Sequence, residues 1–327
     1  VICTGSATGI SLSTTVSGTT VTYRWTVSVL TPPAGGTITG FSNCSSSCGT
    51  LINQTLTNTG TSPGTVRYVV TPWIGLCSGT PVNVDVTVNP NGQVATISDQ
   101  AVCNGNNTAE VIFVTNRTGG TTTYTWTNSN TNIGLAATGT SAGITSFTAT
   151  NTGTAQINGL ITVTPHFANG SVTCTGTATS FRIRVNPIGQ VNQPADLVRC
   201  TGANASVTFS SVNTPAGNTT YAWTNSNTNI GLAVSGNGNI SFTATNTTIA
   251  PISGTIVVTP TFTQNGTACA GTSKSFSITV NPAGQVNDPA DQVLCNNAAT
   301  TQVDFTTNNT GGTTTYSWTN SNTTIGL

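Results

Sequence analysis

The stretch TYTWTNSNTNIGL occupies residues 123–135, and two close copies follow it, TYAWTNSNTNIGL at 220–232 and TYSWTNSNTTIGL at 315–327. A weaker version, TYRWTVSVL, stands at 22–30. The four tryptophans of these stretches are 101, 97 and 95 residues apart, which is the length of one small domain. The sequence therefore predicts a chain of similar modules.

The junctions between the modules repeat as well. Each of three junctions runs from Asn-Pro through Gly-Gln-Val to a cysteine, with 13 residues from the proline to the cysteine. A flexible tether would tolerate changes in length, so this constant spacing predicts a fixed hinge and an extended rod. The predicted modules are 1–88, which is divergent, 89–185, 186–280, and 281–327, which holds only the first strands of a fourth.

Short runs of Val, Ile, Thr, Phe and Tyr, punctuated by Gly, Asn and Pro, indicate β-strands. Six or seven such strands in a module of this length predict an all-β chain of tandem immunoglobulin-like β-sandwiches. In the second module we expect strands near 99–103, 109–115, 121–128, 144–150, 157–167 and 179–185, and a weak strand at 133–138.

The tyrosine and tryptophan of each repeated stretch are two residues apart, so they share one face of a strand. We expect them in the core and not on a ligand, because large aromatic side chains usually serve packing. The Asn and Gly that follow them are expected to shape a turn. The predicted core aromatics are Tyr23, Trp25, Tyr124, Trp126, Tyr221, Trp223, Tyr316 and Trp318.

Eight of the nine cysteines form a pattern that predicts disulfides, and hence an oxidising, extracellular compartment. One bond is expected within each complete module, and a further bond would close a small surface loop. Cys295 lacks a partner under this scheme, since the fourth module is incomplete. The expected pairs are Cys3 with Cys77, Cys103 with Cys174, Cys200 with Cys269, and Cys44 with Cys48.

Charged residues make up only 4% of the chain, and seven basic and seven acidic side chains leave a net charge of zero. This composition lacks the basic surface that nucleic acid requires, and no apolar run approaches the length of a membrane span. Uncharged faces and strand edges favour either a weakly hydrated stalk or self-association.

The sequence offers no reaction centre, so we predict no enzyme, no cofactor and no metal site. His166 is the single histidine, which is too little for a hydrolase triad, and we expect it on a strand facing solvent. Asp99, Asp196 and Asp291 stand at matched junction positions, and only the third junction adds Asp288. A turn or capping role is therefore favoured over bridging calcium, which needs several oxygen ligands.

The second and third modules carry Tyr-x-Trp, paired cysteines, and the motifs VTPHF with SFRIRVNP and VTPTF with SFSITVNP. With these motifs they resemble the PKD-like repeats of very large secreted surface proteins of Bacteroidetes, and most nearly the gliding-motility adhesins exported by type IX secretion. The resemblance implies an immunoglobulin-like sandwich, a location on the bacterial cell surface, and an adhesive or spacer role. The chain departs from the better-known PKD signature after Trp126, where TNSN replaces Phe-Gly-Asp-Gly.

Three functions are consistent with these features. The leading hypothesis is a stalk segment of a large cell-surface adhesin, whose partners are neighbouring modules and a surface polysaccharide or protein ligand. The second is a subunit of a self-assembling extracellular filament. The third is a set of carbohydrate-binding modules of a secreted enzyme, for which Trp73 and Phe41 are loose candidates as exposed aromatics.

Overall fold

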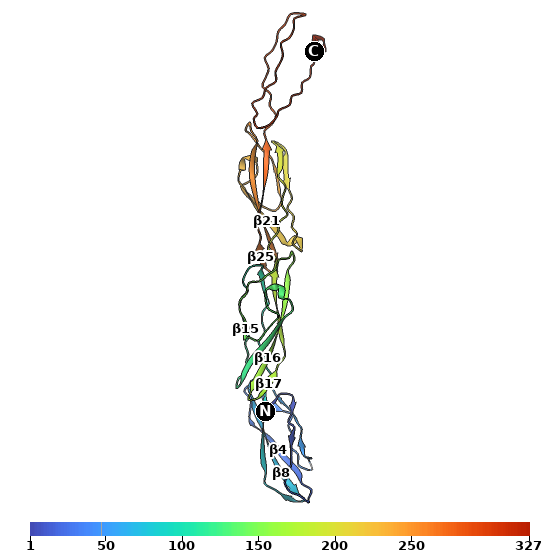
Figure 1. Ribbon diagram of the computed structural model, residues 1–327, viewed down its shortest axis with the longest axis vertical. Helices are drawn as coiled ribbons and strands as arrows, with labels where there is room; N and C mark the ends of the chain where they lie inside the picture. Colours follow the sequence, from blue (N-terminus) through green and yellow to red (C-terminus); the bar gives the residue numbers. More distant parts are fainter. Residues whose placement is uncertain (47) are drawn as a thin grey trace. The chain divides into compact units, whose positions relative to one another are not determined.

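The computed structural model of the chain describes residues 1–46 and 48–327, and it confirms an all-β chain of tandem β-sandwiches (Figure 1). The chain divides into two compact units, Val1–Asn151 with Ile157–Val185, and Thr152–Gln156 with Asn186–Leu327. We keep the four predicted modules as names for stretches of the sequence. No helix in the described residues is long and apolar enough to cross a membrane.

The first module pairs its opening strand parallel to its closing strand, and the long antiparallel strands continue that sheet. Its larger sheet contains β1 (Ile2–Cys3), β10 (Val82–Asn89), β8 (Gly64–Ile74), β4 (Thr22–Thr31) and β9 (Cys77–Ser78). Its shorter strands are β2 (Ser6–Ala7), β7 (Thr55–Asn58) and β5 (Ile38–Thr39), and β3 (Ile10–Ser11) with β6 (Leu51–Ile52).

The second module follows the same plan. Its larger sheet contains β11 (Gln100–Cys103), β18 (Thr179–Asn186), β16 (Ile157–Asn169), β13 (Thr121–Asn128), β14 (Thr138–Gly139) and β17 (Val172–Thr175). Facing it are β12 (Val111–Ile112) and β15 (Gly143–Ile144), and the 3-10 helix η1 covers Thr131–Ile133.

The third module repeats this plan again. Its larger sheet contains β19 (Leu197–Cys200), β26 (Lys274–Asn281), β24 (Ile252–Gln264), β21 (Thr219–Asn225), β22 (Ser235–Asn237) and β25 (Thr267–Ala270). Facing it are β20 (Asn204–Val207) and β23 (Ile240–Thr243). Two 3-10 helices belong to this module, η2 (Ala216–Asn218) and η3 (Thr228–Ile230), and η4 (Thr323–Ile325) follows in the fourth.

Alternation along the strands builds a separate apolar core in each of the three complete modules. In β16 every second residue is buried, and Ile161, Val163 and Phe167 are fully inaccessible to solvent. Because successive side chains point to opposite faces of a strand, this pattern places one row against the core. Trp126 and Tyr124 lie in the same core on β13, as their spacing predicts.

The TNSN segment after the tryptophan forms a compact turn. The Asn128 side chain donates to the carbonyl oxygens of Asn130 and Leu135 at 3.0 Å each, and the Asn130 side chain accepts from the Asn132 amide at 3.1 Å. The turn ends at Gly134, whose φ of 94° is a conformation that favours glycine. It drives Ile133 of η1 into the core, so the repeated stretch serves packing and turn formation together.

The structure contains two short strands of the second module that the sequence analysis did not predict, β14 and β17. Instead of a strand at 133–138, the chain forms η1 and then β14, in which Gly139 pairs with Trp126. A Cβ at Gly139 would collide with the indole ring, so the strand can lie over the tryptophan only with glycine there. The hairpin strand β17 was also missed, because its polar sequence lacks a strand pattern.

The predicted core role of Tyr316 and Trp318 is wrong for the residues present. Trp318 is 60% exposed and Tyr316 is 36% exposed, stacked on Phe305 with ring centroids 5.7 Å apart. Residues 282–327 form no strands in the structure, and they include no counterparts of β16 and β18 (Figure 1). Without the opposing strands, these aromatic rings have no core to enter.

We expect Trp126→Ala to lower the free energy of unfolding of the second module by about 3–5 kcal/mol, because it removes a large buried ring. Urea denaturation followed by circular dichroism measures this change. The control is Thr127→Ala, an exposed position on the same strand, with an expected change within about 0.5 kcal/mol. Equal effects of the two substitutions would contradict a core role for Trp126.

Candidate functional site: the joint between the first two modules

The two repeated cysteine positions of a module lie at opposite ends of its larger sheet. In the first module Cys3 pairs with Asn89 at the end of β10, next to the Gly64 end of β8. Cys77 lies opposite Ile74, at the other end of β8. Ten residues of extended strand separate these ends by about 30 Å, since a strand rises about 3.3 Å per residue.

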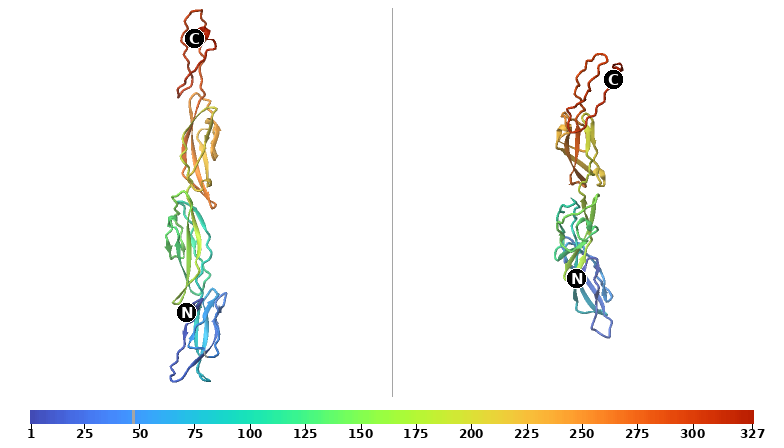
Figure 2. Two further views of the ribbon diagram at one scale, coloured as in Figure 1. Left: turned by 90° about the vertical axis from the view of Figure 1, so that its right-hand side faces the viewer. Right: turned by 45° about the horizontal axis from the view of Figure 1, so that its top comes forward.

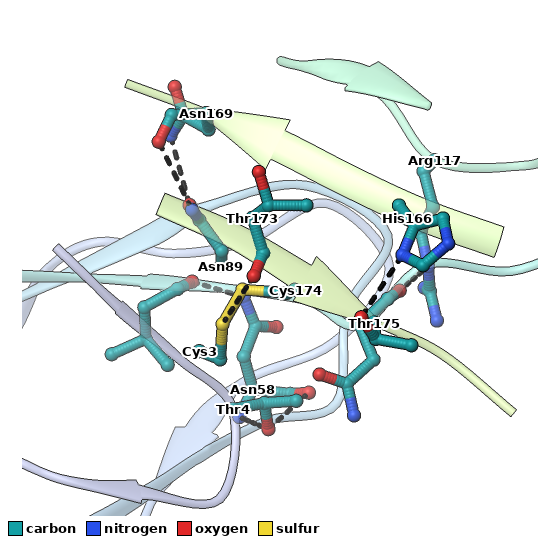
Figure 3. The surroundings of a disulfide bond; sticks show 12 residues. Cys3, Thr4, Asn58, Asn89, Arg117, His166, Asn169, Thr173, Cys174 and Thr175 are labelled. Carbon is teal, nitrogen blue, oxygen red and sulfur yellow. Dashed lines mark hydrogen bonds between the residues drawn. A yellow bond between two sulfur atoms is a disulfide. The ribbon is translucent and has the colours of Figure 1, made fainter. Parts of the chain in front are cut away.

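A disulfide instead joins the first module to the second. Cys3 is bonded to Cys174 across 171 residues of sequence, with the two Cα atoms 5.5 Å apart (Figure 3). In both views of Figure 2 the amino terminus lies where the first two sandwiches meet, as this bond requires. Cys44 and Cys48 are bonded to each other, with Cα atoms 5.9 Å apart.

The expected Cys44–Cys48 bond is confirmed, whereas the three expected bonds between the repeated cysteines of one module are wrong. Cys3 cannot reach Cys77, because bonded cysteines need Cα atoms within about 7 Å and these lie at opposite ends of a sheet. Cys174 bonds Cys3, so it does not pair with Cys103. Cys200 is a free thiol, so the expected bond from Cys200 to Cys269 is absent as well.

Side-chain and backbone amide groups form hydrogen bonds at the same joint. Asn89 is fully buried; its side-chain oxygen Oδ1 accepts from Asn169 Nδ2 at 3.0 Å, and its Nδ2 donates to the Asn169 backbone carbonyl oxygen at 3.4 Å (Figure 3). The Gly92 amide donates to the carbonyl oxygen of Cys174 at 3.1 Å. Gly176 faces the Gly92 backbone so closely that a Cβ there would collide with it. The junction thus docks against the β16–β17 hairpin through backbone contacts that need glycine.

Arg117 also forms hydrogen bonds at this joint. Its Nε donates to the Asn91 carbonyl oxygen at 2.8 Å, and its Nη1 donates to the Gly60 carbonyl oxygen at 2.9 Å. Desolvation at this position lowers the pKa of Arg117, although a guanidinium remains protonated in proteins. The Thr118 amide adds a bond to the Thr61 carbonyl oxygen at 3.0 Å. A charged group here bonds only to neutral carbonyl oxygens.

The second unit contains hydrogen bonds of the same kind. Asn186 is fully buried and donates to the carbonyl oxygens of Gln264 and Thr267 at 2.9 and 3.1 Å. The Gly189 amide donates to the Cys269 carbonyl oxygen at 3.0 Å, as Gly92 does to Cys174. The contacts of the junction with the hairpin are therefore a repeated feature.

In the second unit Asn213 stands at the position of Arg117 and makes the corresponding hydrogen bonds. Asn213 Nδ2 donates to the carbonyl oxygens of Thr154 and Ile188 at 3.3 and 3.2 Å. The Thr214 amide also donates to Thr154, at 2.8 Å. This position therefore needs a side-chain donor that reaches two carbonyl oxygens, and a positive charge is not required.

The junction aspartates hold the closing strands. Asp99 accepts from the Arg182 amide at 2.6 Å and forms an ion pair with Arg184 at 2.9 Å. Asp196 accepts from the Ser277 amide at 2.7 Å. The backbone hydrogen bond from Arg182, together with the Arg184 guanidinium, holds the pKa of Asp99 below its ordinary value. Both residues anchor backbone, in keeping with the structural role expected for them.

His166 lies between two threonines on the larger sheet of the second module. Its Nδ1 is 3.0 Å from the Thr175 hydroxyl (Figure 3). Its Nε2 is 3.1 Å from the Thr125 hydroxyl. It is half-buried on the outward-facing row of β16, as expected for a strand residue that faces solvent. In residues 1–46 and 48–327, no group of three or more His, Cys, Asp or Glu side chains is placed to hold a metal ion.

The two loose candidates for sugar stacking do not form an exposed aromatic face. The Trp73 ring is covered by the Arg24 guanidinium, 4.1 Å from the ring centroid, and Phe41 packs against the first core. A hollow of about 300 Å³ beside Trp223 is lined by small or neutral side chains, including Ser235 and Asn237. None of its lining residues is titratable.

Sequence reasoning missed the residues of the joint, namely Asn89, Asn169, Gly92 and Arg117. The repeated Asn-Pro-x-Gly junction was a visible signal for Asn89 and Gly92. No comparable signal marks Arg117, since the position corresponding to it in the next module is Asn213. Asn169 lies in a hairpin whose sequence differs between modules.

The sequence model of the PKD-like domain family matches residues 1–92. A search of curated proteins finds no match to the chain. The chain is similar to a solved structure of mouse cadherin-23 EC22–24, with 13% identity, coverage of 86% of this chain and 94% of that chain, and a TM-score of 0.32. The PKD-like match thus covers the first module.

Two further solved structures show a likeness of this kind. The FN1–FN3 domains of chicken CNTN1 are 7% identical, with 78% of this chain and 88% of that chain covered and a TM-score of 0.29. The I9–I11 tandem of titin is 12% identical, with 86% and 95% covered and a TM-score of 0.26. At these scores the likeness carries no inference about function.

Replacing Cys3 and Cys174 with serine should lower the free energy of unfolding by up to about 5 kcal/mol, because the bond closes a loop of some 170 residues in the unfolded chain. Guanidinium denaturation measures the loss, and non-reducing peptide mapping of the unaltered chain should show the Cys3–Cys174 link. The control pair, Cys44→Ser with Cys48→Ser, opens a loop closed across only four residues and should cost less. A Cys3–Cys77 link in the map would overturn the joint.

Asp99 should stabilise the second module above its unfolded-state pKa of about 3.9, and this contribution should be lost as the pH falls through its lower folded-state pKa. We expect Asp99→Asn to cost at most about 1 kcal/mol at pH 7, because the ion pair is exposed, and nearly nothing in strong acid. Urea midpoints between pH 7 and pH 2 measure this. Glu110→Gln, an exposed carboxylate of the same module, is the control; an equal pH dependence of the two variants would refute the role.

Proposed function

We propose that this chain is a structural repeat segment, or stalk, of a large secreted cell-surface adhesin, in which it projects a binding region away from the cell. The observation that carries the proposal is the covalent joint between consecutive modules, Cys3 with Cys174. A bond of this kind keeps two sandwiches together under load, which a spacer requires and an independent binding domain does not. The proposed role is therefore mechanical and not enzymatic.

The setting we propose is the surface of a Bacteroidetes cell, with export by type IX secretion and a link to gliding motility. The PKD-like match over residues 1–92 supports this setting at the level of the module. The disulfides fit an extracellular, secreted protein. A surface with only 4% charged residues fits a spacer, because it offers few sites for electrostatic recognition.

A self-assembling extracellular filament is the second candidate, and the exposed apolar side chains of the fourth module favour it. Val293 is 96% exposed and Trp318 is 60% exposed. Strands that complete the fourth sandwich would have to cover these side chains. Strands of another chain would cover them in a filament, and electron micrographs with a regular subunit repeat would favour this function over the stalk.

Small-angle scattering of the 327-residue chain tests the stalk. A compact globule of this length has a radius of gyration of about 20 Å, and a stalk should exceed this value at least roughly twofold without change on dilution. A value near that of a globule would contradict the stalk. A radius that rises with concentration would favour assembly, so the same measurement separates the two candidates.

A further inference from the structure

Cys77 occupies in the first module the position that the bonded Cys174 occupies in the second. Cys77 lies opposite Ile74 in the β8–β9 hairpin, and Cys174 lies opposite Phe167 in the β16–β17 hairpin. In both hairpins the opposing residue stands two places after the proline of a Val-Thr-Pro motif. The two cysteines are therefore equivalent by register and by sequence.

The backbone beyond these cysteines is equivalent as well. The Gly79 amide donates to the Pro72 carbonyl oxygen at 2.8 Å, and the Gly176 amide donates to the Pro165 carbonyl oxygen at 2.9 Å. In the second module this glycine receives the preceding junction, which needs the absence of a Cβ. The first module therefore carries the same receiving surface.

The two hairpins differ in what covers them. Cys174 is only 1% exposed, because Cys3 and the junction residue Gly92 lie over it. Cys77 is an exposed free thiol, and its neighbour Leu76 is 93% exposed. The hairpin of the first module thus leaves uncovered the half-cystine position that is bonded and covered in the second.

Cys200 is the complementary half at the other end of a module. It pairs with Asn281 at the end of β26, as Cys3 pairs with Asn89 at the end of β10. It is free and exposed, whereas Cys3 is bonded. Cys200 therefore presents an opening-strand thiol of the type that binds a hairpin cysteine.

The fourth module already docks in the manner of the second. The Thr310 amide donates to the Ile249 carbonyl oxygen at 2.8 Å, and Asn309 donates to the Ala283 carbonyl oxygen at 2.7 Å. These bonds correspond to those of Thr118 and Arg117 at the first joint. A fourth module completed from this start would bring its hairpin to the end of the third module, where Cys200 lies.

We propose that Cys77 and Cys200 are the two open halves of a disulfide ladder, in which every module is bonded to the adjoining copy of itself in the same polypeptide. Cys77 takes the opening-strand cysteine of the copy before it, and Cys200 takes the hairpin cysteine of the copy after it. This inference deepens the proposed stalk and rests on it only in taking adjoining modules as partners; scattering of the 327-residue chain tests the stalk separately.

The bond forms by thiol–disulfide exchange with a small-molecule disulfide such as oxidised glutathione. The first thiolate attacks one sulfur of the oxidant, which leaves a mixed disulfide and releases one glutathione thiolate. The second cysteine thiolate then displaces the other glutathione. Two protein thiols lose two electrons and two protons in total, and the oxidant gains them as two glutathione thiols.

The first test completes the fourth module by adding a copy of residues 136–185 directly after Leu327, which corresponds to residue 135 in the repeat. After refolding with oxidised glutathione, non-reducing peptide mapping should link Cys200 to the added hairpin cysteine within one chain. Thiols alkylated without denaturant should fall from the three of the original chain to two. Cys295 should remain free, since its own partner would belong to a fifth module.

Matched controls make the test decisive. Cys200→Ser in the extended chain should abolish the link and leave the added hairpin cysteine reactive. Protection of Trp318 fluorescence from quenching reports independently that the added strands complete the fourth sandwich. A free Cys200 in an extended chain with a protected Trp318 would overturn the proposal, and so would a Cys200 bond found only between chains.

A second variant covers failure of the added strands to fold. A copy of residues 1–100 placed before Val1 uses the natural junction, and its own Cys3 copy should then bond to Cys77 of the original first module. The Cys77 of the added copy is replaced by serine (Cys77→Ser), so Ellman's reagent should count two reactive thiols in this variant against the three of the 327-residue chain. Full reactivity of Cys77 in this variant would overturn the ladder for the hairpin half.

Discussion

The length of the central strand is the constraint on which the joints depend. In each complete module the opening-strand cysteine lies beside one end of the central strand and the hairpin cysteine lies at its other end, about 30 Å away. A disulfide spans only about 6 Å between Cα atoms, so the two cysteines of one module are too far apart to bond each other. A disulfide of either cysteine must therefore reach beyond its module, as the bond from Cys3 to Cys174 does.

The rest of the first joint follows from where this bond lies. Once the hairpin of the second module is held against the end of the first, polar backbone groups of both are removed from water and need partners. The buried amide of Asn89 and the Gly92 backbone satisfy those of the hairpin, and Arg117 satisfies carbonyl oxygens of the adjoining loops. Glycine at positions 92 and 176 is required because the two backbones approach too closely for a Cβ.

The turns inside the modules are ordered with few charged side chains. Asparagine side chains order these turns: Asn128 and Asn225 close the turns after Trp126 and Trp223 by donating to backbone carbonyl oxygens. This arrangement lets a neutral sequence place Ile133 and Ile230 fully in the core. An uncharged surface and amide-defined turns are thus two consequences of the same composition.

The sequence by itself determined the all-β class, the tandem sandwiches, and the core position of Trp25, Trp126 and Trp223, because strand alternation and the repeat length are local properties. It could not determine the cysteine partners. A bond within a module and a bond to the next module both recur with the period of the repeat, so regular spacing supports either scheme equally. Only the tertiary structure decided between them, because it places the two cysteines of one module at opposite ends of a strand and brings those of consecutive modules together.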